Sequence, residues 1–215
     1  MWDDLLLQAA IILVTVFMFL YTQNIPQKFF SKLRFRNQSS LESKRHFIKG
    51  AQFLSQAQSA KDRSSISSLA KSAEIEADLA IALDSKDPAA HILKSLALEL
   101  RGFKTSALDS LDAALSPALA KLLTGDERGD ALYKRAELKL SVGRRREVDS
   151  AIEDLVESVK LKGDNVKAFC LLGECYKKKG MNDEAKMAFQ DALNVRPNYS
   201  VALEALQQFS SSISD

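Results

Sequence analysis

The sequence is poor in the residues that build disulfide-rich and loop-rich proteins. Its 215 residues include two cysteines, four prolines and eight glycines. Cys170 and Cys175 lie five positions apart, so on a helix they point roughly 140° away from each other and cannot form an ordinary disulfide. A disulfide scaffold is therefore excluded, and two unpaired thiols are typical of a reducing compartment. We expect both thiols to be buried or half-buried structural residues.

Residue patterns that carry catalysis or bind metal ions are also missing. The two histidines, His46 and His91, are far apart in sequence and belong to no HExxH, Ser-His-Asp or Cys-His arrangement. We expect His91 to pack in a core. The chain contains neither glycine-rich phosphate-binding motif, and acidic pairs such as Glu153 and Asp154 are expected on solvated helix faces. We therefore expect no enzymatic activity, no cofactor and no metal site.

Alanine, leucine, lysine, glutamate and serine are abundant instead, which favours helices. Hydrophobic residues make up 46% of the chain, too many for a disordered protein. The net charge of +2 is unevenly spread, because residues 22–49 carry seven basic residues and one acidic residue, whereas residues 50–215 are slightly acidic. A nucleic-acid-binding surface usually makes the whole domain basic, so we expect no nucleic-acid partner.

One long apolar run, from Leu5 to Tyr21, contains 17 residues and no charge. As a helix it would cover about 26 Å, slightly less than the ~30 Å hydrocarbon core of a bilayer. Asp3 and Asp4 precede the run, which disfavours a cleavable signal peptide. A buried helix of a soluble domain is disfavoured because no polar face recurs within the run. We expect residues 1–24 to form a single transmembrane anchor that also contacts membrane lipid.

A basic stretch follows the apolar run. Its membrane-flanking cations are Lys28, Lys32, Arg34 and Arg36. By the positive-inside rule they place the C-terminal side of the span in the cytosol, and they suit anionic headgroups. A span this short fits thinner bilayers, such as the endoplasmic reticulum or the outer membrane of a mitochondrion or plastid. We therefore expect a single-pass membrane protein whose remaining chain faces the cytosol.

The segment that begins at Val166 carries a pattern of eight residues. Counted from Val166, positions 4, 7, 8, 11, 20, 24, 27 and 32 hold Phe169, Leu172, Gly173, Tyr176, Ala185, Phe189, Ala192 and Pro197. This spacing resembles the tetratricopeptide repeat family, with phenylalanine in place of the usual tryptophan. The overall sequence character of residues 87–209 also resembles plant tetratricopeptide-repeat-like proteins of unassigned role. The resemblance implies antiparallel helix pairs that bury their apolar faces against neighbouring pairs.

Three glycines, Gly102, Gly143 and Gly180, stand at position 15 of successive units, where the turn between two helices is expected. Two units depart from the family at positions that are normally apolar. Their residues there are Lys94, Arg135 and Lys139. We expect the stems of these three side chains to pack while their charged heads reach water.

The resemblance implies an all-α fold, a right-handed solenoid of helix-turn-helix units behind the transmembrane helix. We expect Ser64 to cap a helix in the first pair and Gly125 to end an extra helical turn that begins near Leu119. We expect an anchor at residues 1–24, a basic linker at 25–40, a solenoid at 41–209 and a tail at 210–215. Within the solenoid we expect a degenerate repeat or cap at 41–86, repeats at 87–127, 128–165 and 166–199, and a capping helix at 200–209.

Tetratricopeptide repeat proteins use the first helix of each unit to line a concave groove that binds another protein or peptide. Carried onto this chain, the groove candidates are Ile92, Leu96, Tyr133, Lys134, Glu137, Lys167, Leu171 and Glu174. The resemblance implies a membrane-tethered adaptor or receptor. The alternative is a structural subunit packed permanently in a larger membrane complex, which would expose a large apolar patch when isolated.

One known specificity of such grooves is not expected here. Repeats that clamp the terminal carboxylate of Hsp70 or Hsp90 use lysine, asparagine and arginine at five groove positions. Those positions hold Ile92, Leu96, Lys134, Lys167 and Leu171, of which only Lys167 matches. Without the polar cluster a buried carboxylate would lack partners, so we do not expect Hsp70 or Hsp90 tail binding.

Overall fold

The computed structural model describes the backbone of residues 25–143 and 147–211 and the side chains of residues 39–143 and 147–209. This part of the chain consists of helices and short connections, without a strand. The expected anchor, residues 1–24, lies outside the described residues, as do the side chains of Lys28, Lys32, Arg34 and Arg36. Among the helices that are described, none combines the length and the apolar character needed to cross a membrane.

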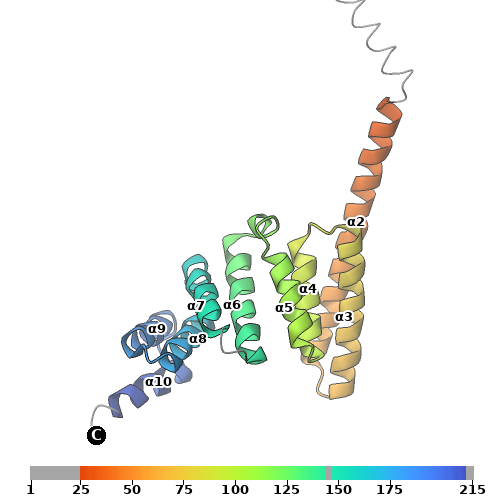
Figure 1. The fold of residues 1–215 in the computed structure, drawn as a ribbon. Coiled ribbons are helices and arrows are strands. Elements are labelled where there is room, and N and C mark those ends of the chain that lie inside the picture. Colours follow the sequence, from red (N-terminus) through yellow and green to blue (C-terminus); the bar gives the residue numbers. More distant parts are fainter. Residues whose placement is uncertain (1–24, 144–146, 212–215) are drawn as a thin grey trace, which may run out of the picture.

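The helices form antiparallel pairs that stack side by side (Figure 1). The helices are α2 (Ile25–Ser59), α3 (Arg63–Leu83), α4 (Pro88–Leu100), α5 (Lys104–Ala114), α6 (Gly125–Val142), α7 (Glu147–Leu161), α8 (Val166–Lys178), α9 (Asn182–Val195) and α10 (Ser200–Ser211). Successive pairs are α2 with α3, α4 with α5, α6 with α7 and α8 with α9, and α10 packs on α9. The expected all-helical solenoid is confirmed for the described part of the chain.

Three glycines make the turns inside the pairs, as the sequence predicts. Gly102, Gly143 and Gly180 have φ angles of 87°, 79° and 76°. A side chain is strained in this left-handed region, whereas glycine is not. These turns let the second helix of each pair start within a few residues of the end of the first.

The start of α3 differs from the expectation. The carboxylate of Asp62 accepts the backbone N–H of Ser65 at 2.7 Å, so Asp62 caps this helix and Ser64 lies inside it. Aspartate is as strong a cap as serine, and its position two residues before Ser64 lets its carboxylate accept one of the first free N–H groups of the helix. Residues 25–40, expected as a linker, belong to α2, whose first half extends beyond the stack (Figure 1).

The start of α6 also differs. Gly125 is the first residue of α6 and does not end an extra turn. Thr124 caps the helix through a reciprocal pair of hydrogen bonds with Glu127, a capping box that fixes the boundary at this point. The extra helical turn expected near Leu119 is present between α5 and α6 as a short 3₁₀ helix, Ala120–Leu122, which ends before Gly125.

The core is a row of small clusters, each shared by at least three helices. One joins α2, α3 and α4, the next α4, α5 and α6, and two more join α6 to α10. Alanine is frequent in these clusters because its small side chain lets neighbouring helices approach closely. At Gly173 a Cβ atom would lie 2.8 Å from the buried ring of Phe189, so that ring occupies the space which the glycine leaves.

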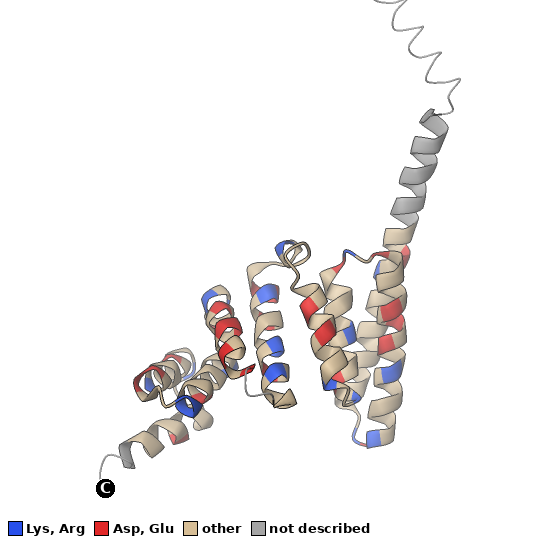
Figure 2. Cartoon of the chain, viewed as in Figure 1, with Lys and Arg blue, Asp and Glu red and all other residues tan. Residues whose placement is uncertain are grey.

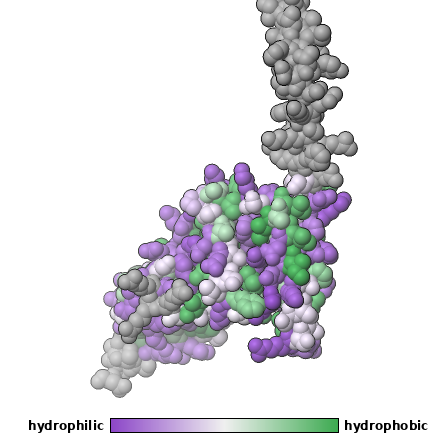
Figure 3. Space-filling model, turned by 45° about the vertical axis from the view of Figure 1, so that its right-hand side comes forward, coloured by the Kyte–Doolittle hydropathy of each residue, from purple (hydrophilic) through white to green (hydrophobic). Residues whose placement is uncertain are grey.

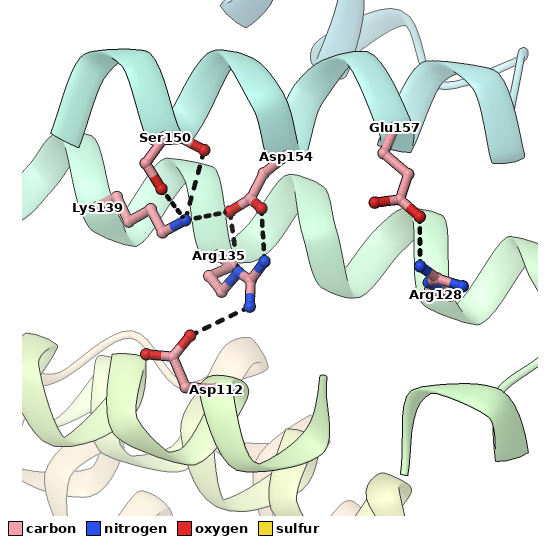
Figure 4. Close-up of polar contacts among 7 residues, drawn as sticks. All are labelled: Asp112, Arg128, Arg135, Lys139, Ser150, Asp154 and Glu157. Atoms are coloured by element: carbon pink, nitrogen blue, oxygen red, sulfur yellow. Dashed lines mark hydrogen bonds and ion pairs between the residues drawn. The ribbon is translucent and has the colours of Figure 1, made fainter. Parts of the chain in front are cut away.

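The charged heads of Arg135 and Lys139 on α6 are held by carboxylates instead of lying free in water, and their side chains are only 19% and 13% exposed. Arg135 Nε donates to Asp154 Oδ2 at 2.9 Å, and Lys139 Nζ donates to the same oxygen at 2.6 Å (Figure 4). Lys139 also donates to Ser150 Oγ at 2.6 Å. Asp154 on α7 is only 5% exposed, so the expectation of a solvated face was wrong for this residue.

The same network reaches the preceding pair. Arg135 Nη1 donates to Asp112 of α5 at 3.2 Å, so α5, α6 and α7 are joined by charged hydrogen bonds (Figure 4). In the first repeat Lys94 forms an ion pair with Asp78 of α3 at 2.7 Å. At these normally apolar positions the chain therefore replaces apolar packing with contacts between opposite charges on neighbouring helices.

Cys170 and Cys175 are buried on α8 and form no disulfide, as the sequence predicts. Burial raises the pKa of each thiol to about 11, because the apolar surroundings disfavour the charged thiolate. These residues therefore act as small apolar core side chains at neutral pH.

Candidate peptide-binding groove

A groove of about 810 Å³ crosses the first helices of the four pairs. Its walls come from α2, α4, α6 and α8, together with the connections that precede α8 and follow α9. Stacked helix pairs place their first helices along one continuous surface, which is why residues far apart in sequence meet there. The groove is large enough for a peptide segment.

The end of the groove formed by α2 and α4 is apolar. The residues that line it are Phe47, Ala51, Leu54, Ile92, Leu93 and Leu96. Leu54 and Leu93 are buried, whereas Phe47, Ile92 and Leu96 are half-buried and keep part of their apolar surface accessible. A ligand side chain that covered this surface would gain about 25 cal/mol per Å² of apolar area removed from water.

The centre of the groove is formed by α6. The hydroxyl of Tyr133 donates to Glu137 Oε1 at 3.4 Å, and Lys134 Nζ lies 2.7 Å from Glu137 Oε2 and 2.9 Å from Glu99 Oε2. Burial raises the pKa of Tyr133, and the Glu137 carboxylate raises it further. Burial would lower the pKa of Lys134, but the hydrogen bonds to Glu137 and Glu99 outweigh this effect and raise it. Both groups thus keep their protons at neutral pH.

The end formed by α8 and the connections around it is charged. Lys162, in the connection between α7 and α8, donates a hydrogen bond from Nζ to Asp130 Oδ2 on α6 at 2.6 Å. Lys167 at the start of α8 and Arg196 after α9 also line this end, and both are exposed. The guanidinium carbon of Arg196 lies 5.7 Å from the ring centroid of Tyr199, close enough for a cation–π contact.

The groove brings together most of the candidates expected from the sequence. Ile92, Leu96, Tyr133, Lys134 and Lys167 all line it. The remaining three do not. Glu137 is a hydrogen-bond partner of Tyr133 and Lys134 but does not line the groove. Leu171 packs against the cluster shared by α6, α7, α8 and α9, and Glu174 is exposed on α8.

Two parts of the groove were missed in the sequence. The α2 wall, Phe47, Ala51 and Leu54, has the spacing of one helix face, but its segment lacks the repeat signature. Arg196 and Tyr199 flank Pro197 in a connection that the repeat pattern treats only as a turn. For Arg196 and Tyr199, the closeness of a cation and an aromatic residue in the sequence was the one signal that could have predicted their role.

The histidines lie outside the groove. His46 Nδ1 is 2.6 Å from Glu76 Oε2, between α2 and α3. His91, expected in the core, is half-buried, and its Nε2 lies 3.4 Å from the carbonyl oxygen of Ser85. Within the described ranges no three side chains of metal-binding type come together.

Charges of both signs are interspersed along the described helices (Figure 2). Figure 3 shows apolar surface in separate patches between hydrophilic side chains. The exposed large apolar residues are distributed from α2 to α10, with Leu41 and Ile48 at one end and Val201 and Leu203 at the other.

Comparison with known proteins agrees with this geometry. Residues 166–199 match the family model of the tetratricopeptide repeat. A crystal structure of MamA is 26% identical, with a TM-score of 0.51, over 60% of this chain and 70% of that one. Pseudomonas aeruginosa pilF is 17% identical, with a TM-score of 0.61, over 83% of this chain and 71% of that one.

A third solved structure is the first tetratricopeptide repeat domain of Spaghetti (RPAP3) bound to the HSP90 peptide SRMEEVD. It is 18% identical, with a TM-score of 0.50, over 61% of this chain and 99% of that one. Curated protein sequences give no match. Residues 166–199 are thus similar to a tetratricopeptide repeat in sequence, and the solved structures support the tetratricopeptide repeat fold for the described part of this chain.

Proposed function

We propose that this protein is a membrane-tethered adaptor or receptor whose tetratricopeptide repeat groove faces the cytosol and binds a peptide segment of another protein. The groove itself carries the proposal, because the first helices of successive pairs form its walls and leave about 810 Å³ open. Proteins of this fold generally mediate protein–protein interactions. The RPAP3 domain with its bound HSP90 peptide is one solved example of the same fold.

The ligand that we propose is not the tail of Hsp70 or Hsp90. The apolar residues Ile92 and Leu96 line the groove where a carboxylate clamp would need polar donors. Lys134 is already held by Glu99 and Glu137, so it has little to offer a ligand carboxylate. At 18% identity, the likeness to the RPAP3 domain supports the fold alone.

The tether belongs to the proposal as well. The uncharged run from Leu5 to Tyr21 and the basic stretch that follows it support a single-pass anchor with the repeats in the cytosol, at the endoplasmic reticulum or at the outer membrane of a mitochondrion or plastid. A tether of this kind raises the local concentration of a captured partner at one membrane. We propose a binding role without catalysis, cofactor or nucleic acid.

A groove variant tests the binding role. We would express the full chain in cells with a proximity-labelling tag at its C-terminus and compare it with the variant Leu96→Ala/Tyr133→Ala/Lys167→Ala. The matched control is Phe103→Ala/Val156→Ala/Met187→Ala, which removes three exposed apolar side chains outside the groove. We expect the groove variant to lose one set of labelled proteins that the control keeps. Equal labelling by all three proteins would reject the groove as the binding surface.

The structural-subunit alternative predicts a different isolated protein. A subunit packed permanently in a complex should expose one large apolar patch and aggregate when it is alone. The exposed apolar side chains described above are instead distributed along the stack, which favours the adaptor. Light scattering on a chain that lacks residues 1–24 separates the two, because an adaptor should be a helical monomer and a structural subunit should aggregate.

A further inference from the structure

The cations that line the groove differ in whether they already have a carboxylate partner. Lys134 lies between Glu99 and Glu137, and Lys162 hydrogen-bonds to Asp130 at 2.6 Å. A ligand carboxylate gains little from such cations, since it would have to compete with a partner that is already in place. The centre of the groove is therefore electrostatically satisfied without a ligand.

Lys167 and Arg196 are different. Both are exposed, both line the charged end of the groove, and neither forms an ion pair with another residue in the described ranges. The contact with Tyr199 gives the Arg196 guanidinium a preferred position at 5.7 Å from the ring. A planar guanidinium and an ammonium are the side-chain groups that bind carboxylates most strongly.

Three acidic residues, Glu127, Asp130 and Asp164, line the groove together with the two cations. Glu127 accepts a hydrogen bond from Thr124, and Asp130 accepts one from Lys162. Asp164 also acts on Lys162, whose pKa is raised mainly by its hydrogen bond to Asp130. Asp164 makes no ion pair with Lys167 or Arg196. Lys167 and Arg196 therefore remain available to a negatively charged ligand group.

The opposite end of the groove, between α2 and α4, favours apolar ligand side chains. Between α2 and α4 the wall is formed by aliphatic and aromatic side chains such as Phe47, Ile92 and Leu96. A charged ligand group placed there would lose water without gaining a partner, whereas an apolar side chain would gain from burial. The groove thus has one apolar end and one end with free positive charge.

On the basis of the function proposed above, we propose that the ligand is an acidic amphipathic peptide. Its bulky apolar side chains pack between α2, α4 and α6, and an aspartate or glutamate side chain binds Lys167 and Arg196. We assign the carboxylate to a side chain and not to a chain terminus, because a terminal clamp needs a cluster of polar donors and the groove offers apolar residues at those positions.

Selection of random peptides tests this chemistry on the full-length protein in detergent micelles. Short random peptides would be displayed as internal or N-terminal fusions, so that no free C-terminal carboxylate is present. We expect the enriched peptides to combine apolar residues with aspartate or glutamate. Enrichment of peptides without acidic residues would overturn the proposal.

A second experiment reverses the charges of the two groove cations. Lys167→Glu/Arg196→Glu should weaken binding of the enriched peptides by at least about tenfold, the effect of losing charge-assisted hydrogen bonds. The control Lys71→Glu/Lys160→Glu changes the net charge equally at exposed positions outside the groove and should bind as the unaltered protein does. Circular dichroism checks that both variants stay folded.

The outcomes separate this proposal from the function on which it depends. Peptides that need Leu96 and Tyr133 but ignore the reversal at Lys167 and Arg196 would overturn the acidic-ligand proposal and leave the peptide groove standing. If no enriched peptide is sensitive to Leu96→Ala/Tyr133→Ala, both the ligand chemistry and the groove function are contradicted.

Discussion

At the scale of single residues, Asp154 occupies a position where one carboxylate serves two cations. Asp154→Ala leaves the half-buried Arg135 and Lys139 without their shared carboxylate, and we expect the free energy of unfolding to fall by about 3 kcal/mol. Asp149→Ala removes the exposed contact with Lys179 and should cost at most about 1 kcal/mol. Urea denaturation followed by circular dichroism measures both.

A compensated variant is the control for this prediction. Arg135→Leu/Lys139→Tyr/Asp154→Leu replaces the whole charged group with apolar side chains of the type that the repeat pattern favours. Because replacing a buried ion group is often neutral or stabilising, we expect this variant to recover most of the stability lost in Asp154→Ala. Equal stability of Asp154→Ala and the unaltered protein would show that the network does not hold α6 and α7 together.

The buried thiols give a prediction about reactivity. With the pKa of Cys170 and Cys175 raised to about 11, the thiolate fraction at pH 8 is about a hundredfold lower than in the unfolded chain. We expect iodoacetamide to modify the native protein correspondingly slowly and the urea-unfolded protein quickly, as measured by mass spectrometry. Similar rates in both states would contradict the burial of these residues.

The same shift has a consequence for stability. A thiol whose pKa is raised by folding keeps its proton in the native state, while the unfolded state loses that proton near its ordinary pKa of 9.0. The unfolded state therefore binds fewer protons above this pH, so stability falls as the pH rises from about 9 to about 11. Cys170→Ala/Cys175→Ala should show a smaller fall over this window.

At the scale of elements, the capping box of α6 decides where the helix begins. Thr124→Ala removes the side-chain partner of the Glu127 N–H and should lower the free energy of unfolding by about 1 kcal/mol at pH 7. Thr105→Ala, in the first turn of α5 where no side chain caps the helix, should change it by less than about half as much. Thermal unfolding by circular dichroism measures the difference.

The cap also predicts a dependence on pH. Hydrogen bonds from the backbone and hydroxyl of Thr124 lower the pKa of Glu127 below its ordinary value of 4.5. A lowered carboxyl pKa contributes stability above 4.5, and this contribution is lost as the pH falls through the native pKa. The penalty of Thr124→Ala should therefore be smaller at pH 3 than at pH 7, and an equal penalty at both values would contradict the reciprocal cap.

Local patterns predicted the helix pairs because glycine turns and apolar spacing act within one pair. Gly102, Gly143 and Gly180 identified the turns, and the all-helical stack followed from the match at residues 166–199. The residues at which helices begin were harder to predict from the sequence, because specific capping hydrogen bonds set them. Several residues near Asp62 and Thr124 are capable of capping, and only the folded backbone selects one.

Contacts between distant helices could not be predicted from either helix alone. The sequence of α7 alone predicts Asp154 as a surface acid. Its partners Arg135 and Lys139 come from α6, which packs beside α7 only in the folded chain. The groove wall on α2 was missed for the same reason, since it becomes part of the groove only when α4 packs next to it. The repeat spacing did place Tyr133, Lys134 and Lys167 on the groove, because their helix positions are fixed relative to the repeat.

At the scale of the whole molecule, the proposed tether predicts how the protein partitions. The uncharged run from Leu5 to Tyr21 should keep the full chain in the membrane fraction during carbonate extraction at high pH. Deletion of residues 1–24 should release it into the soluble fraction with unchanged helicity. A full-length chain that carbonate already extracts would show that this segment does not span a bilayer.

The groove is most directly tested by site-specific photocrosslinking in cells. A photoreactive phenylalanine analogue would replace Leu96 in the groove wall or, as the matched control, Phe103 in the exposed turn between α4 and α5. If the groove holds a peptide of another protein, position 96 should give a discrete crosslinked partner and position 103 should not. Crosslinks from position 103 alone, or the same partner from both positions, would contradict the account.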